Sequence, residues 1–125
     1  MNIPANEQAV MPYLLLSGAE KFIAFTVAVF NAEVLNRMHT PEGNIRHAHI
    51  TISGCSLMLA DATPDYPPCT TGLFVYVPDA KAAWEKALQL GATSVMEPVA
   101  TPYASCAAGF KDPFGNTWWP ATPLN

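Results

Sequence analysis

The chain has 125 residues, of which 50% are hydrophobic and 13% are charged, a composition typical of one packed globular domain and not of a disordered segment. The formal net charge is -4 and basic residues do not cluster, which argues against a nucleic-acid or anionic-membrane surface. The longest apolar runs are far shorter than the ~18 residues of a membrane span, and the first nine residues lack the basic and apolar parts of a signal peptide.

The first half of the chain predicts one helix among four strands. Residues 1–11 have the pattern of an arm or a fraying terminus, and the wholly apolar run 13–16 suits a strand buried on both faces. Ser17 and Glu20 have the spacing of a capping box, which predicts a helix from Gly18 to Phe30. Further strand patterns occupy residues 33–39, 45–53 and 57–61.

The second half repeats this order. Residues 62–71 contain three prolines and are predicted to form a connector, because proline cannot lie within a helix or a central strand. Asp79 is a good N-cap for an alanine-rich helix at 80–90. The predicted strands are 73–77, 93–99, 103–111 and 117–121. Such a repeat divides the chain into two similar modules, 12–61 and 72–123.

Several motifs resemble the glyoxalase/bleomycin resistance protein/dioxygenase superfamily, also called vicinal oxygen chelate proteins. The turn Asp112–Asn116 is similar to the D-P-x-G-N turn of that family. Similarities to its PhnB-like branch are Pro12-Tyr13-Leu14, Gly18-Ala19, Phe30-Asn31-Ala32, Arg37, His47-Ala48 and Met58-Leu59-Ala60-Asp61. The resemblance covers about residues 12–123. It implies an α+β fold of two βαβββ modules that form curved mixed sheets around a cleft.

The resemblance does not extend to the metal-binding residues of the family. Enzymes of this family bind a divalent metal at four positions, one near the start of the first strand and one on the last strand of each module. By the resemblance, those positions hold Pro12, Met58, Gly72 and Trp119 here. None of these side chains is a hard or borderline ligand, and a thioether favours soft ions such as Cu(I). We therefore expect no divalent metal and no other cofactor.

His47 and His49 share one face of a predicted strand, since residues two apart point the same way. Ordinary metal sites need three or four donors, and His39 is the only other histidine. The pair is therefore expected to form polar pocket-wall or surface residues. A ligand-binding or proton-transfer role for one imidazole is the other interpretation, because its pKa near 6.5 permits either charge state.

The same alternation outlines a pocket. The predicted lining comprises Leu14, Leu16, His47, His49, Met58, Phe74, Tyr76, Ser105 and Trp119. Large apolar walls beside small residues suit a flat or greasy ligand, although the same side chains can also fill the space themselves. Trp118 has the opposite parity and is predicted to lie in the core beneath the second helix.

The function that follows is metal-free binding of a small apolar or aromatic molecule, of the drug-sequestering type that the resemblance implies. One alternative is an enzyme of glyoxalase, lyase, dioxygenase or isomerase type that uses His47, His49 or Tyr103 in a non-standard site. A second is a structural or interaction protein with a self-filled pocket. We expect a homodimer, as the family implies, with no nucleic-acid or membrane partner. The three cysteines show no CxxC spacing, which predicts free thiols in the cytoplasm.

Overall fold

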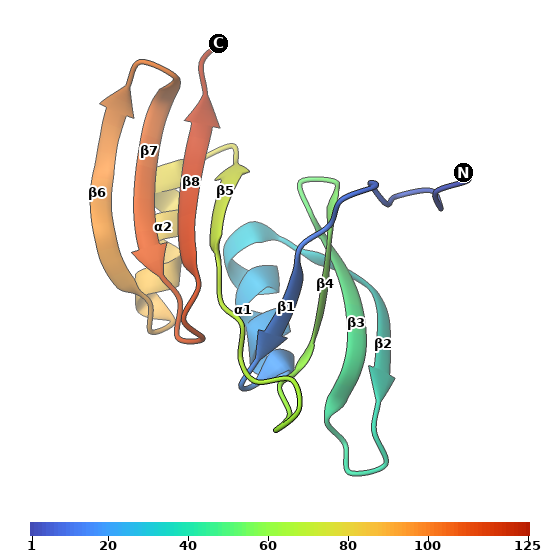
Figure 1. Cartoon of the computed structure of the whole chain (residues 1–125). Helices are drawn as coiled ribbons and strands as arrows, with labels where there is room; N and C mark the ends of the chain where they lie inside the picture. Colours follow the sequence, from blue (N-terminus) through green and yellow to red (C-terminus); the bar gives the residue numbers. More distant parts are fainter. The chain divides into compact units, whose positions relative to one another are not determined.

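A computed structural model describes all 125 residues, which form two compact units (Figure 1). The first unit comprises residues 1–27 and 31–70, and the second comprises residues 28–30 and 71–125. Each unit contains one four-stranded sheet. Neither helix of the chain is long and apolar enough to cross a membrane.

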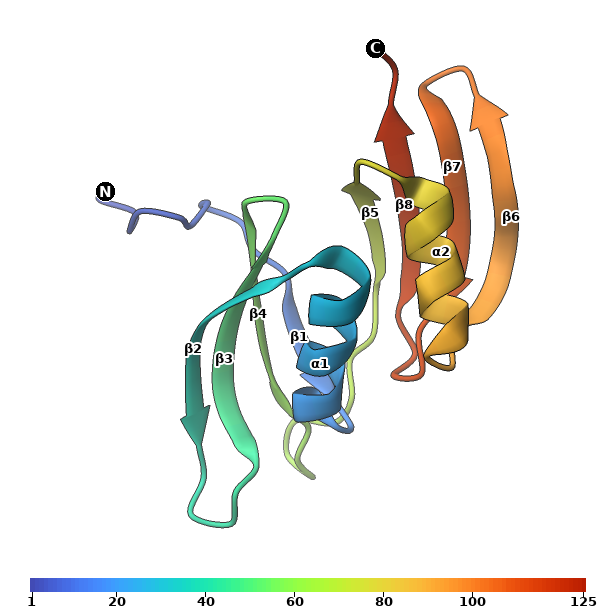
Figure 2. The ribbon, with the colours of Figure 1, turned by 180° about the vertical axis from the view of Figure 1, so that it is seen from behind.

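The first sheet has its strands in the order β1-β4-β3-β2. The parallel pair is β1 with β4, and the other neighbours are antiparallel. Helix α1 lies over one face of this sheet (Figure 2). The elements are β1 (Tyr13–Leu16), α1 (Ala19–Phe30), β2 (Glu33–His39), β3 (Ile45–Ile52) and β4 (Cys55–Asp61).

The second sheet repeats this plan in the order β5-β8-β7-β6, with β5 parallel to β8 and α2 over one face (Figure 2). The elements are β5 (Gly72–Tyr76), α2 (Ala80–Gln89), β6 (Thr93–Thr101), β7 (Ala104–Lys111) and β8 (Thr117–Pro123). The predicted α+β fold of two βαβββ modules is confirmed. Strand β6 continues through Pro98, because an edge strand with shifted register loses little from a missing N–H.

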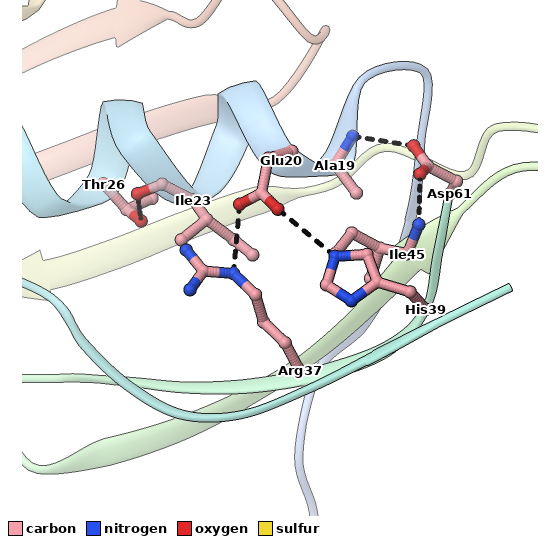
Figure 3. Close-up of polar contacts among 8 residues, drawn as sticks. All are labelled: Ala19, Glu20, Ile23, Thr26, Arg37, His39, Ile45 and Asp61. Atoms are coloured by element: carbon pink, nitrogen blue, oxygen red, sulfur yellow. Dashed lines mark hydrogen bonds and ion pairs between the residues drawn. The ribbon is translucent and has the colours of Figure 1, made fainter. Parts of the chain in front are cut away.

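The start of α1 differs from the predicted capping box. The N-cap residue is Gly18, whose φ of 94° is left-handed and which has no side chain to cap the helix. A carboxylate from the end of β4 replaces the cap, since the Ala19 N–H donates to Asp61 Oδ1 at 2.8 Å (Figure 3). Glu20 instead accepts from Arg37 Nε at 3.0 Å and lies 3.6 Å from His39 Nε2. The cap is therefore supplied by a residue 42 positions away in the chain.

The face of the first sheet that α1 covers forms a core. Leu14 and Leu16 are 2% and 0% exposed, and the strand register places Leu14 beside Leu59. The prediction that these two leucines line a pocket is therefore wrong. Tyr13 is exposed and Leu15 is half-buried, so β1 is buried on one face only. The residues of β1 that face away from the core are therefore Tyr13 and Leu15, one position before each predicted leucine.

The turn before β8 is built around one carboxylate. Asp112 Oδ1 accepts from the N–H groups of Phe114 and Asn116 at 2.8 and 2.9 Å. Its Oδ2 accepts from the Trp118 indole N–H at 2.8 Å. Trp118 is 1% exposed and packs against Phe30 with ring centroids 4.6 Å apart. The turn thus fixes the first tryptophan of β8 in the core, as its parity predicts.

Candidate functional site

The face of the first sheet opposite α1 carries two histidines, a tyrosine, a serine and a methionine. We call it the first open face. The strand register pairs Tyr13 and His49 with Met58, so these three residues lie side by side. Its members along β1, β3 and β4 are Tyr13, Leu15, His47, His49, Ser56, Met58 and Ala60.

A cavity of about 530 Å³ lies at one end of the first open face. Strands β1, β3 and β4 supply its floor, while the β2–β3 hairpin loop and the proline-rich connector supply its walls. The connector is held in place because Cys69 N donates to Leu15 O at 2.9 Å and a tight turn joins Thr63 to Tyr66. The lining is Tyr13, Leu15, Thr40, Asn44, Ile45, Arg46, Ala60, Asp61, Ala62, Thr63 and Tyr66. This volume falls within the range of small-molecule sites, about 300–1,000 Å³.

His47 and His49 do share this face, and each has one polar neighbour. His47 Nδ1 lies 3.3 Å from the Tyr13 hydroxyl, and the two rings are 5.8 Å apart. His49 Nε2 lies 2.6 Å from Ser56 Oγ. His39 pairs with Glu20 at the helix instead of joining them, and no three His, Cys, Asp or Glu side chains gather where they can hold a metal ion.

The N-terminal arm fixes the hydrogen-bonding role of His49. Ser56 is fully buried, and its hydroxyl donates to the Asn6 carbonyl oxygen. A serine hydroxyl has one proton, so the short contact with His49 requires Nε2–H to be the donor. The unbonded Nδ1 of a neutral His49 is then an acceptor. The arm itself is anchored, since the Gln8 amide bonds Ser56 O at 2.8 Å and Ser56 N at 3.3 Å.

The second unit has an aromatic counterpart, which we call the second open face. Phe74 pairs with Trp119 in the strand register and contacts Tyr76 edge-on, with centroids 5.0 Å apart. Tyr103, in the β6–β7 turn, lies 6.1 Å from Phe74. Phe74, Tyr76 and Tyr103 are 51%, 51% and 53% exposed. An aromatic surface of this kind offers stacking faces to a flat molecule.

Trp119 lies against the backbone of the neighbouring strand. A Cβ placed on Gly109 would be 2.5 Å from Trp119 Cζ3, so the indole lies where only glycine leaves room. Trp119 is half-buried on the face opposite Trp118. Ser105 is exposed near the start of β7, where its hydroxyl is 3.3 Å from the Thr122 carbonyl oxygen.

The structure thus separates the predicted site residues into groups. His47, His49 and Met58 lie on the first open face, while Phe74, Tyr76 and Trp119 lie on the second. None of the nine predicted lining residues borders the cavity, and sequence reasoning missed Tyr13, Leu15, Arg46 and Tyr66, which do. Only the register of β1 against β4 identifies the first two. No local signal marks Tyr66, because a loop side chain reaches a cavity through tertiary contacts.

The side chains at the four positions that the resemblance assigns to a divalent metal do not suit one. Pro12 and Gly72 have no donor side chain, and an indole such as that of Trp119 is a hydrogen-bond donor only. Met58 offers a soft thioether. The backbone of Pro12 is occupied as well, since its carbonyl oxygen accepts from Met58 N at 3.0 Å.

Comparison with known proteins gives one consistent result. The family model described as Glyoxalase/Bleomycin resistance protein/Dioxygenase superfamily matches residues 13–119. An uncharacterized protein of Mycobacterium bovis, Mb0911c, is 30% identical over 129 residues, covering 94% of this chain and 85% of that protein. The solved structure of TnmS3, an antibiotic binding protein from Streptomyces sp. CB03234, has a TM-score of 0.71 and 26% identity over 98% of this chain and 100% of that one. A PhnB protein from Bacillus cereus has a TM-score of 0.71 and 17% identity, covering 92% of this chain and 99% of that chain.

Proposed function

Because the chain belongs to the glyoxalase/bleomycin resistance protein/dioxygenase superfamily, we propose that it is a metal-free protein that binds a small apolar or aromatic molecule, as in drug sequestration. The cavity of about 530 Å³ on the first open face carries this proposal. Its lining combines two tyrosines and several aliphatic side chains with a few polar groups, the composition usual for small-molecule sites.

A comparison also supports ligand binding. TnmS3, which shares the fold and 26% identity, is described as an antibiotic binding protein. We infer from this likeness only the class of ligand, a small organic molecule, and not its identity.

The proposal extends to assembly and location. We propose a homodimer, because separated chains would leave the aromatic second open face and the sheet edges uncovered. A cytoplasmic protein agrees with the three free thiols of Cys55, Cys69 and Cys106.

A neutral aromatic probe tests binding at the cavity. We expect 2-naphthylmethanol, titrated into the 15N-labelled protein, to shift the amide resonances of Leu15, Ala60 and Thr63. Leu15→Trp should fill the cavity and weaken binding about tenfold or more, which corresponds to roughly 1.4 kcal/mol. The matched control Leu35→Trp changes an exposed residue of β2 outside the cavity and should bind like the wild type. Unshifted resonances at millimolar probe would overturn the proposal, and chemical conversion of the probe would favour an enzyme.

Elemental analysis tests the absence of a metal. The side chains at the four family positions offer no hard or borderline donor, so we expect the purified protein to contain no stoichiometric Zn, Ni, Mn or Fe. About one tightly held divalent ion per chain would contradict this, and His47 and His49 would then be the first residues to substitute.

A further inference from the structure

The cavity on the first open face contains two charged side chains, Arg46 and Asp61, and they are in different situations. Both Asp61 oxygens are occupied, Oδ1 by the Ala19 N–H at 2.8 Å and Oδ2 by the Ile45 N–H at 2.7 Å (Figure 3). Asp61 also lies at the N-terminus of α1, whose partial positive charge offsets a carboxylate. The negative charge in the cavity is therefore already matched within the fold.

Arg46, by contrast, has no ion-pair partner. The ion pairs of the structure join Glu20 to Arg37 and to His39, and none involves Arg46. Its guanidinium has five N–H donors and no acceptor, in the planar arrangement that suits a carboxylate. Arg46, which borders the cavity and is exposed, is therefore a positive residue without an ion-pair partner.

The hydroxyl groups of the lining point to the same ligand chemistry. Thr40 Oγ1 accepts from Asn44 N at 3.2 Å, and Thr63 Oγ1 accepts from Tyr66 N at 3.1 Å. Each hydroxyl already accepts a backbone hydrogen bond, so each retains a proton to donate. Together with Arg46, the cavity therefore presents several donors beside apolar side chains, and it favours a ligand rich in acceptors.

The geometry points to a small aromatic carboxylate as the ligand class, with its ring among Tyr13, Leu15 and Tyr66 and its carboxylate on Arg46. This inference rests on the proposed function, since it names the ligand of the same cavity. Charge-assisted hydrogen bonds between guanidinium and carboxylate are among the stronger polar contacts, and their planar match selects carboxylate over alcohol. The negative net charge of the chain opposes anions in general, so a preference for the carboxylate is a local effect of Arg46 and the hydroxyl donors.

A matched pair of probes tests the assignment. We expect 2-naphthoate to bind about tenfold more tightly than the neutral 2-naphthylmethanol, with a preference that falls as salt is raised. Arg46→Gln should remove the preference, measured as the ratio of the two affinities in the same variant, and an unchanged urea midpoint shows that the variant is folded. Arg37→Gln is the control, because Arg37 pairs with Glu20 and does not line the cavity, and it should retain the preference.

Each other outcome has one meaning. Equal binding of both probes to the wild type would overturn the carboxylate assignment while the proposed function stands. A preference that survives in Arg46→Gln would overturn the role of Arg46. Failure of both probes to bind would overturn the proposed function and this inference with it.

Discussion

Trp118 and Trp119 are neighbours in the sequence, but they lie on opposite faces of the sheet and differ in burial. Trp118 is fully buried, packs against Phe30 and donates its indole N–H to Asp112. Trp119 is half-buried and faces the other side of the sheet. We expect Trp118→Ala to lower the free energy of unfolding by about 3–5 kcal/mol, because it leaves a large cavity. Trp119→Ala should stay within the about 0.5–3 kcal/mol of ordinary substitutions. Urea denaturation measures both.

Trp84 offers a control for this comparison. It is half-buried on α2, and its indole N–H lies 3.2 Å from Ser94 Oγ. Trp84→Ala should resemble Trp119→Ala and not Trp118→Ala. A larger loss for Trp119→Ala than for Trp118→Ala would mean that the two faces of β8 have been exchanged.

Side-chain parity is predictable from the sequence only where a strand has a reference point. On β8 the turn Asp112–Asn116 supplies one, so the faces of Trp118 and Trp119 follow from counting. β1 has four residues, three of them leucine, and no alternation of polar and apolar positions. Its facing is decided by pairing with β4, where Tyr13 and not Leu14 lies beside Met58. Leu14 and Leu16 therefore lie on the buried face of β1 and not on the predicted pocket face.

At the scale of elements, the start of α1 depends on a residue from another strand. Asp61 bonds the first N–H of the helix and the first N–H of β3 at once. Asp61→Asn leaves one carbonyl oxygen for two donors and removes a charge at the helix N-terminus, so we expect a loss of about 1–2 kcal/mol. The midpoint of urea denaturation reports it.

Asp65→Asn is the matched control for this substitution. Asp65 is exposed in the connector, so the same chemical change there should alter the midpoint little. An equal effect of the two substitutions would show that overall charge, and not the bonds of Asp61, determines stability.

The elements were largely predictable because their signals are local. Turn glycines, the Asp79 cap of α2 and the repeat of the two modules are all present in short stretches of sequence. Three features were not predictable from the sequence: the cap of α1, the contact of Gln8 with Ser56, and the cavity. Each joins residues between about 40 and 50 positions apart or depends on the course of a loop, and no local pattern records such contacts.

At the scale of the whole molecule, the exposed rings of the second open face predict self-association. We expect sedimentation velocity to show a dimer at micromolar concentration, since an aromatic surface of this kind is costly to leave in water. Tyr76→Lys should shift the profile toward monomer. Val10→Lys, on the exposed arm, should not. A monomer alone at micromolar wild-type protein would rule the dimer out.

The contact between Gly109 and Trp119 also restricts how this surface can evolve. Any side chain at position 109 would meet the indole at 2.5 Å, so gaining even a methyl group there forces the ring to move. A smaller residue at position 119 would remove that restriction and open a hollow over β7. The residue tolerated at position 109 therefore depends on the residue at position 119, and the reverse also holds. We expect the two positions to covary among homologous sequences. A substitution at Gly109 should move the Trp119 ring and so change the shape of the aromatic surface, even though every aromatic residue is retained.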